Sequence, residues 1–263
     1  MKMNEIEYYL HLRHLAGYKL AIEEIKRRIG KNCTILEVGC GVGYGTNFIS
    51  SQFKVVGLDI SKEAIKEARK RYKHILFVVG DGINLPFKDE QFDAVISLQV
   101  IEHIKKKEVP KYLNEIKRVL KNYGIFILTT PNKEMRLLPF QKPWNPFHEH
   151  EYSAKELEKV LSKVFPVCYV KGIGAVEEIR EIEKERVKQT VIDAYLKQPL
   201  GRILRKLSIL PPLQSNERLL WNEMEEAWRL YKVKGHKLEK LFFLEDVRKD
   251  SLDLFGIAFK VRK

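Results

Sequence analysis

Short hydrophobic runs alternate with helical patterns along most of this chain. Seven runs are predicted to be strands, at Thr34–Val38, Lys54–Leu58, Ile75–Val79, Phe92–Ser97, Gly124–Thr130, Val167–Lys171 and Leu252–Val261. Strands that alternate with helices are typical of βαβ units, in which helices cover a mostly parallel sheet. The pattern therefore predicts an α/β fold.

The predicted helices show hydrophobic residues every three or four positions. One helix covers Glu5–Arg28 and another Lys62–Tyr72, and in Val109–Leu120 the hydrophobic residues fall on one face. Ser153 and Glu156 form a capping box ahead of a further hydrophobic pattern, which predicts a helix start at that point.

Residues 176–250 interrupt the alternation with helical patterns around a turn-rich centre. Because a strand-like run returns at Leu252–Val261, we interpret them as a helical insertion in one domain. The predicted organisation of residues 1–263 is a single domain with a helical cap (1–30), a cofactor-binding core (31–175), an insertion that acts as a lid (176–250) and a last strand (252–261). An aromatic stripe in the insertion favours core packing, although it could also serve as a homodimer surface; it comprises Trp221, Trp228 and Tyr231.

The composition excludes several classes of protein. With 263 residues, 44% of them hydrophobic, the chain can bury a sizeable core, which excludes a wholly disordered protein. No stretch approaches the ~18 apolar residues of a spanning helix, and the polar start Met1-Lys2-Met3-Asn4-Glu5 is unlike a secretion signal. The three cysteines contain no CxxC pair. We therefore expect a cytoplasmic protein.

The chain is basic, with 48 Lys and Arg against 35 Asp and Glu and a formal net charge of +13. Such an excess can attract nucleic acid, anionic lipid or an acidic substrate. The basic residues are scattered over the predicted helices rather than gathered in one stripe, which favours solvated helix faces.

The most informative stretch is a buried strand that runs into Gly39, Gly41 and Gly43 and then into a helix. Glycines let the backbone turn sharply and approach a ligand closely. The acid Glu37 argues against a pyrophosphate ligand, which needs helix amides without added negative charge, and it suits an ammonium group. Together with the G-x-G-x-G spacing, it makes a nicotinamide dehydrogenase a poor fit.

Two further strand ends carry acids. Asp59 ends the second strand about 20 residues on, a position suited to accept two ribose hydroxyls. Gly80-Asp81 ends the third strand, where a carboxylate or a neighbouring amide could hold the edge of a base. Three such strand ends in order indicate a nucleoside-containing cofactor.

At these residues the sequence resembles the class I S-adenosylmethionine-dependent methyltransferases. The matching pieces are Glu37-Val-Gly-Cys-Gly-Val-Gly43, Gly57-Leu-Asp59, Gly80-Asp81, Leu85-Pro-Phe87 with Phe92-Asp93, Val100-Ile-Glu-His103, and Gly124 to Asn132. The resemblance implies a seven-stranded sheet with order 3-2-1-4-5-7-6 and an antiparallel last strand, and S-adenosylmethionine as cofactor. The resemblance places the cofactor at a set of residues along these strand ends. With their neighbours in the chain, the predicted cofactor-binding residues are Glu37, Gly39, Cys40, Gly41, Gly43, Asp59, Ile60, Gly80, Asp81, Gly82 and Gln99.

Candidate catalytic residues follow the fourth and fifth predicted strands. Glu102 and His103 come directly after the fourth, and His148 and His150 lie in a loop after the fifth. Loops at the carboxyl edge of an open sheet commonly bind ligands. Jointly these four side chains have the composition of a cation site. This set resembles the metal site of the small-RNA 3′-terminal 2′-O-methyltransferases, which hold a metal ion with two Glu and two His. The first Glu of their E-x-x-E-H motif is Gln99 here, and an amide is a poor substitute for a carboxylate, so no metal ligand is assigned.

Three functions remain open. The leading prediction is an enzyme that methylates an oxygen or nitrogen atom of a small molecule or glycan, because the segment 145–157 loosely resembles methyltransferases that act on such acceptors. The second is an RNA methyltransferase, with metal-assisted transfer to a 2′-oxygen, or a protein methyltransferase. The third is a non-catalytic cofactor-binding partner that regulates another protein, since the glycine loop argues only for binding.

Overall fold

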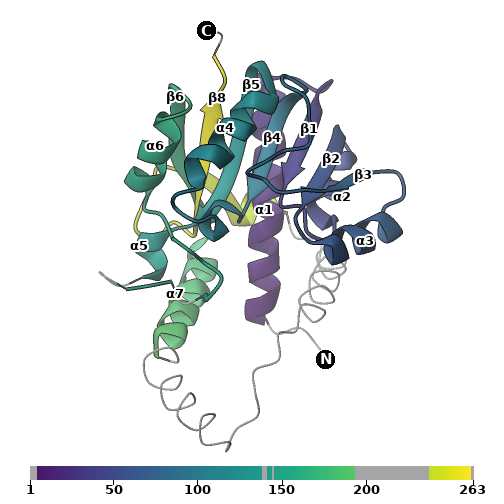
Figure 1. The fold of residues 1–263 in the computed structure, drawn as a ribbon. Coiled ribbons are helices and arrows are strands. Elements are labelled where there is room, and N and C mark those ends of the chain that lie inside the picture. Colours follow the sequence, from purple (N-terminus) through teal and green to yellow (C-terminus); the bar gives the residue numbers. More distant parts are fainter. Residues whose placement is uncertain (1–4, 138–140, 144, 193–236, 262–263) are drawn as a thin grey trace, which may run out of the picture.

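The computed structural model describes residues 5–137, 141–143, 145–192 and 237–261. These residues form an eight-stranded sheet with the order β3-β2-β1-β4-β5-β8-β6-β7 (Figure 1). Its strands are β1 (Thr34–Val38), β2 (Lys54–Asp59), β3 (Leu76–Val79), β4 (Phe92–Leu98), β5 (Leu120–Pro131), β6 (Val167–Ala175), β7 (Phe242–Glu245) and β8 (Asp253–Phe259). Neighbours among β1 to β5 pair in parallel, and β8 is antiparallel to β5 and β6. The predicted α/β class and the antiparallel last strand are confirmed.

The described sheet has one strand more than predicted. The additional strand β7 pairs antiparallel with the second half of β6, from Gly172 to Ala175. The sequence Phe242–Glu245 is short and follows a helical turn, so its own pattern gives little strand signal. The nine residues of β6, against five predicted, reach beyond the hydrophobic run because β8 and β7 supply pairing partners on both sides.

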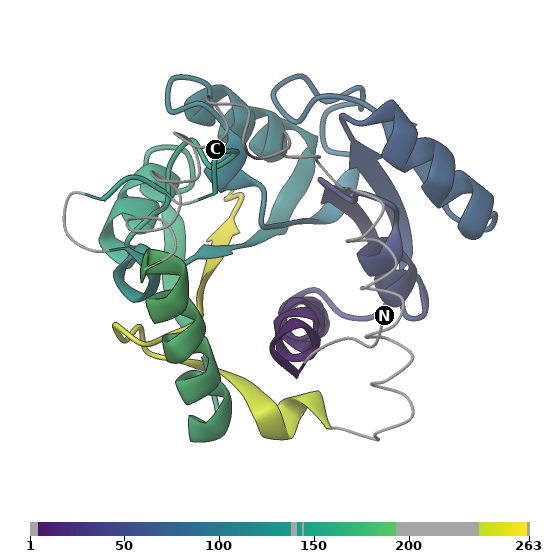
Figure 2. The same cartoon turned by 90° about the horizontal axis from the view of Figure 1, so that it is seen from below.

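Helices cover both faces of the sheet. They are α1 (Glu5–Arg28), α2 (Tyr44–Ser50), α3 (Lys62–Arg71), α4 (Val109–Val119), α5 (Lys133–Arg136), α6 (Ala154–Ser162), α7 (Glu177–Ile192) and α10 (Leu238–Leu241), with a 3-10 turn η1 (Ile101–His103). Buried residues of α1 and α2 form one core with the strands, and α4 and α6 form a second core. Figure 2 shows α1 end-on, with α2 on one side and α7 on the other.

Local signals predicted these helices well. The helix α1 has the predicted bounds, and α6 begins with the predicted capping box, in which the side chains of Ser153 and Glu156 each bond the other's backbone N–H. The insertion opens with α7 and closes with α10 and β7. Its centre at 193–236, including the aromatic stripe of Trp221, Trp228 and Tyr231, lies outside the described residues.

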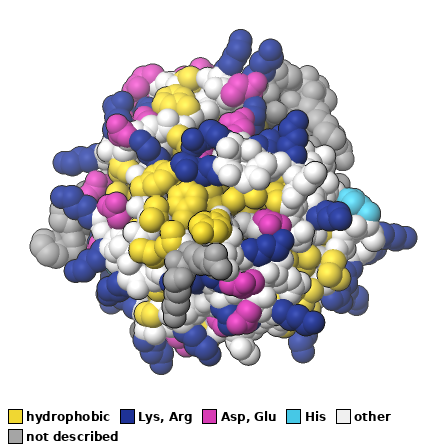
Figure 3. All heavy atoms as spheres, turned by 90° about the horizontal axis from the view of Figure 1, so that it is seen from above, with side chains coloured by type: hydrophobic (Ala, Val, Ile, Leu, Met, Phe, Trp, Pro, Cys, Tyr) yellow, Lys and Arg dark blue, Asp and Glu magenta, His cyan; other side chains and the backbone are white. Residues whose placement is uncertain are grey.

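Figure 3 looks onto the end of the molecule where the parallel strands begin. Hydrophobic side chains gather near the middle of this face, and lysines and arginines surround them with acidic side chains in between. The mixture agrees with basic residues scattered over helices rather than gathered in a stripe. Among the described helices, none is both long and apolar enough to cross a membrane.

The carboxyl ends of β1 to β5 meet at the opposite edge of the sheet, because these strands run in parallel. This edge lies at the bottom of Figure 1. The glycine loop, Asp59, Asp81, Gln99 and η1 each follow or end one of these strands. Segments far apart in the sequence are thereby brought to one place, as is usual for ligand sites in open α/β sheets.

Candidate active site

The glycine loop is bonded to the end of β2 through Asp59. The backbone N–H of Gly41 donates to Oδ2 of Asp59 at 2.8 Å, and the N–H of Ser61 donates to Oδ1 at 2.9 Å. A carboxylate oxygen can accept more than one hydrogen bond, so both oxygens keep capacity for a ligand. Asp59 is thus held in one orientation and can still accept two hydroxyl groups.

The three glycines of the loop have positive φ angles of +80° (Gly39), +53° (Gly41) and +80° (Gly43). A Cβ on Gly39 would lie 2.3 Å from Cγ2 of Val100, and one on Gly43 would lie 2.6 Å from Cζ of Phe77. Packing therefore excludes side chains at both positions. A Cβ on Gly41 would meet nothing within 4 Å, so the backbone there borders open space that a ligand can enter.

The structure places Glu37 behind the loop. Its carboxylate accepts hydrogen bonds from the hydroxyls of Tyr18 at 2.6 Å and Thr46 at 2.5 Å, and only 1% of the residue is exposed. Burial raises the pKa of Glu37 to about 7. Cys40 is also buried, in a small core with Ile65 and Phe77. Neither side chain lines the cavity described next, so both support the loop from its protein side.

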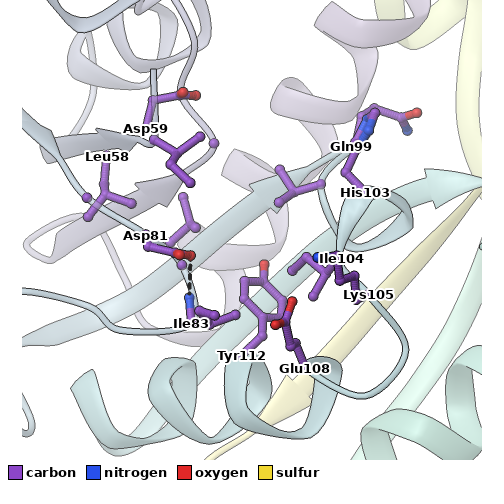
Figure 4. Close-up of a pocket in the computed structure, with 16 residues that line it drawn as sticks. Leu58, Asp59, Asp81, Ile83, Gln99, His103, Ile104, Lys105, Glu108 and Tyr112 are labelled. Carbon is purple, nitrogen blue, oxygen red and sulfur yellow. Dashed lines mark hydrogen bonds between the residues drawn. The ribbon is translucent and has the colours of Figure 1, made fainter. Parts of the chain in front are cut away.

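A cavity of about 390 Å³ lies at the carboxyl edge of the sheet. It contains seven of the predicted cofactor residues and one predicted catalytic residue, namely Gly39, Asp59, Ile60, Gly80, Asp81, Gly82, Gln99 and His103. In Figure 4, Asp59 and Asp81 lie on one side and Gln99 and His103 on the other, with Tyr112 of α4 and Glu108, which precedes α4, between them. The cavity therefore joins the predicted cofactor residues to the start of the predicted catalytic cluster.

The cofactor side of the cavity combines acids with an apolar edge. The carboxylate of Asp81 accepts a hydrogen bond from the N–H of Ile83 at 3.0 Å, which fixes the turn after β3. Ile60, directly after Asp59, is 69% exposed although its side chain is hydrophobic. An exposed apolar side chain in the same cavity as two oriented carboxylates can cover a flat aromatic ring whose edges need hydrogen bonds.

Gln99 has an unusual backbone. Its φ is +58°, a left-handed conformation that is costly for a residue with a side chain and concentrates at functional sites. Its N–H donates to the carbonyl of Thr129 at 2.9 Å, and its side-chain amide donates to the hydroxyl of the same residue at 3.1 Å. Both bonds to β5 hold this conformation and fix the end of β4 beside the cavity.

Glu102 is fully buried behind the cavity. Its Oε2 accepts a hydrogen bond from the hydroxyl of Thr130 at 3.0 Å, while its Oε1 has no hydrogen-bond partner among the described residues. Burial raises the pKa of Glu102 to about 8. Its backbone carbonyl accepts hydrogen bonds from the N–H groups of Glu149 at 2.8 Å and His150 at 3.2 Å. These bonds fasten the loop after β5 to η1.

His103 and His148 meet beside Glu102. Their rings lie edge to face, with centroids 4.8 Å apart. Nδ1 of His103 lies 3.0 Å from the carbonyl oxygen of Phe147, and Nδ1 of His148 lies 2.8 Å from Oε1 of the buried Glu151. Burial lowers the pKa of His103, which favours its neutral form. The structure thus brings together three of the four predicted catalytic residues.

His150 lies apart from this group. Its ring packs edge-on against Tyr152 at 4.6 Å and lines a separate cavity of about 280 Å³ between α4 and α6. The expectation that His150 shares one cluster with Glu102 and His103 is therefore not supported by its position. The chain bends at Glu149 between the two histidines, and no pattern in the sequence predicts this bend.

Several residues of the site carried no clear signal in the sequence. Lys105, Glu108 and Tyr112 line the cavity, Thr130 bonds Glu102, and Glu151 bonds His148. Glu151 stands three residues after His148, a spacing that could have identified the pair. The others depend on contacts between segments that are distant in the chain.

Comparisons with known proteins agree with this geometry. A sequence profile described as a methyltransferase domain matches residues 36–128. A probable S-adenosylmethionine-dependent methyltransferase of Mycolicibacterium smegmatis is 34% identical over 143 residues, 53% of this chain and 55% of that protein. An uncharacterized protein of Methanocaldococcus jannaschii is 36% identical over 178 residues, 67% of this chain and 73% of that protein.

A solved structure shares the fold. It is phosphoethanolamine N-methyltransferase 2 of Haemonchus contortus in complex with S-adenosyl-L-methionine, with a TM-score of 0.54 and 20% identity, covering 92% of this chain and 52% of that one. This chain belongs to the class I S-adenosylmethionine-dependent methyltransferases, and S-adenosylmethionine is the cofactor of that family. The residues fit the cofactor, because Gly41 borders open space and Asp59 offers an oriented carboxylate.

The names of two other relatives refer to different methyl acceptors, a fatty acid and tRNA. A fatty-acid O-methyltransferase of Mycolicibacterium smegmatis is 36% identical over 46% of this chain and 43% of that protein. A probable tRNA methyltransferase 9B of Mus musculus is 33% identical over 42% of this chain and 26% of that protein. The chain spans about half the length of the first curated relatives that it matches, 55% in each case.

Proposed function

We propose that this protein transfers the methyl group of S-adenosylmethionine to an oxygen or nitrogen atom of a small molecule or glycan. The observation that carries the proposal is the cavity that runs from Asp59 and Asp81 to Gln99 and His103. Its volume of about 390 Å³ falls within the range of small-molecule sites, about 300–1,000 Å³.

In this proposal the cofactor side is built by the first three strand ends. Asp59 accepts the ribose hydroxyls, Ile60 and Asp81 hold the adenine, and the amino-acid part lies over Gly39–Gly43. Gln99 stands near the methionine end. Glu37 acts from behind by bonding Tyr18 of α1 and Thr46 of α2, which keeps the loop in place.

Bound S-adenosylmethionine supplies an activated methyl group, so the protein has to align the acceptor and take any proton that it loses. His103 reaches the cavity from the end opposite Asp59 (Figure 4). The cluster of Glu102, His103 and His148 is the group that we assign to the acceptor. Gln99, strained and bonded to β5, separates the cofactor side from this cluster and fixes their spacing.

The substrate class rests on one relative, because most of the cavity is assigned to the cofactor. The fatty-acid O-methyltransferase acts, by its name, on a small molecule, and the tRNA methyltransferase keeps a nucleic-acid acceptor as an alternative. Three statements remain predictions: that the insertion at 176–250 acts as a lid, that the protein forms a homodimer, and that the chain is one domain with a cap, a core and an insertion.

Calorimetric titration with S-adenosylmethionine, its demethylated product and NAD tests the cofactor side. We expect binding of both sulfur compounds and none of NAD, and the reverse would refute the assignment. Methyl transfer from labelled cofactor is then measured with small hydroxyl and amine compounds, lipid acids and total RNA. Turnover confined to RNA would refute the small-molecule class, and failure to turn over any acceptor would favour the regulatory reading.

A further inference from the structure

We propose that Glu102, His103 and His148 bind one divalent transition-metal ion at the acceptor end of the cavity. Their possible ligand atoms, a carboxylate oxygen and one ring nitrogen from each histidine, all lie within 4.8 Å of one another. Two imidazoles and one carboxylate form the ligand set of catalytic Zn²⁺ sites and of open iron sites. Such sets occupy one side of the ion and leave positions for water or substrate.

The hydrogen bonds of the two histidines leave the second ring nitrogen of each available. A carbonyl and a carboxylate only accept hydrogen bonds, so Nδ1 of His103 carries its proton toward Phe147, and Nδ1 of His148 carries its proton toward Glu151. In the neutral rings, Nε2 therefore keeps its lone pair. Metal-binding histidines are commonly oriented by such a bond from the other nitrogen.

Glu102 supplies an independent sign of a missing partner. Its side chain is fully buried, yet Oε1 has no hydrogen-bond partner among the described residues. Leaving a buried acceptor unpaired costs stability, and it costs more when the group is charged. A cation beside Oε1 would provide the missing interaction.

The backbone holds the ligands in place from two segments of the chain. The bonds from the N–H groups of Glu149 and His150 to the carbonyl of Glu102 fix the loop that carries His148 against η1, which carries Glu102 and His103. Two ligand atoms of one ion, each about 2.1 Å from it, lie at most about 4.2 Å apart. The widest pair has to close by roughly half an ångström, which rotation of the exposed His103 ring can provide.

The ion would lie beside the cavity, because one of its ligands, His103, lines it. An acceptor with a hydroxyl or carboxylate oxygen is the chemical class that such an ion would hold there. This use of the ion rests on the proposed methyl transfer, whereas binding of the ion does not. The two can therefore be tested separately.

The test is titration of tag-free, chelator-treated protein with Co²⁺, followed by visible absorption and by competition with Zn²⁺. We expect one equivalent to bind with an absorption band typical of nitrogen and oxygen ligands. Glu102→Gln and His148→Ala should weaken binding at least about 100-fold, and Glu151→Gln about 10- to 100-fold, as for residues that orient a ligand. His150→Ala, from the same loop but facing another cavity, is the matched control and should bind as the unmodified protein does.

Circular dichroism of each variant confirms that it is folded. Absence of stoichiometric binding would overturn the proposal, and so would binding that survives Glu102→Gln and His148→Ala in folded protein. Equal weakening by His150→Ala would overturn it too, because surface histidines would then be the ligands. Cofactor titration of the same samples separates the two proposals: metal binding without cofactor binding would refute only the proposed function, and the converse would refute only the metal site.

Discussion

Nε of Arg13 in α1 lies 3.2 Å from Oδ2 of Asp253 at the start of β8. The same guanidinium donates to Oε1 of Glu183 in α7 at 2.9 Å, and all three side chains are at most 8% exposed. One buried side chain therefore joins the first helix, the start of the insertion and the last strand. It ties segments that are 240 residues apart to the edge of the sheet that carries the site.

Arg13→Met should destabilise the protein by about 3–5 kcal/mol, because it removes the arginine beside the buried Asp253 and leaves the buried Glu183 with Arg186 alone. Arg27→Met, near the exposed end of the same helix, should cost far less, since its partner Glu24 also pairs with Arg28 and the arginine is 60% exposed. Urea unfolding of both variants measures the difference. Equal losses would contradict a structural role for the buried pair.

Gly39→Ala and Gly41→Ala should differ in stability although both glycines have positive φ. The new Cβ at Gly39 would overlap Val100, which adds about 1–3 kcal/mol to the backbone strain. The Cβ at Gly41 would enter open space, so only strain of about 1 kcal/mol remains. Urea unfolding gives the order, and a less stable Gly41 variant would contradict the described packing.

Asp59→Ala and Gly41→Val should weaken binding of S-adenosylmethionine by at least about tenfold. The first removes the hydroxyl acceptor and the second fills the open space beside the loop. Calorimetry measures the affinity and circular dichroism the fold. Asp93→Ala is a matched control, because its carboxylate bonds Thr34 and Lys121 at the other end of the strands; similar weakening there would mean that loss of stability explains the result.

Glu102→Gln should change how stability depends on pH in chelator-treated protein. Burial raises the pKa of Glu102 to about 8 in the folded state, above its unfolded value of roughly 4.3, so folding favours the protonated form. The contribution of this protonation is fully present below about pH 4 and is lost as pH rises through 8. Relative to the Gln variant, the unmodified protein should therefore lose stability, on the order of a few kcal/mol, from pH 5 to pH 9.

Urea unfolding at pH 5, 7 and 9 measures this difference. Glu37, whose pKa burial also raises, is present in both proteins, so its contribution cancels in the comparison. A difference that stays constant across these pH values would contradict the raised pKa.

Glu151→Gln should lower methyl-transfer turnover about 10- to 100-fold while leaving affinity for S-adenosylmethionine unchanged. The buried carboxylate orients His148, and an amide in its place can present its N–H₂ group to the ring instead. Glu149→Gln removes the same charge from an exposed side chain two residues earlier and serves as control. Steady-state rates and calorimetry on both variants measure turnover and cofactor affinity. Equal turnover of the Glu151→Gln and Glu149→Gln variants would show that the orientation of His148 is unimportant.

The sequence by itself determined the elements and the cofactor side of the site. The strand positions, the bounds of α1 and the capping box of α6 follow from periodicity and from side chains within four residues of one another. The glycine loop and Asp59 are local signals too, because each stands at a fixed place after a strand. Because β1 and β2 pair in parallel, the glycine loop and Asp59 lie at the same edge of the sheet.

Only the tertiary structure decided which side chains meet across long distances in the chain. The pairing of β7 with β6, the bonds from Tyr18 and Thr46 to Glu37, and the meeting of Glu102 with His148 join segments whose separation no local pattern records. His148 and His150 looked equivalent in the sequence. Residues two apart in an extended segment would point to the same side, but the chain bends at Glu149, so His148 packs against His103 while His150 lines another cavity.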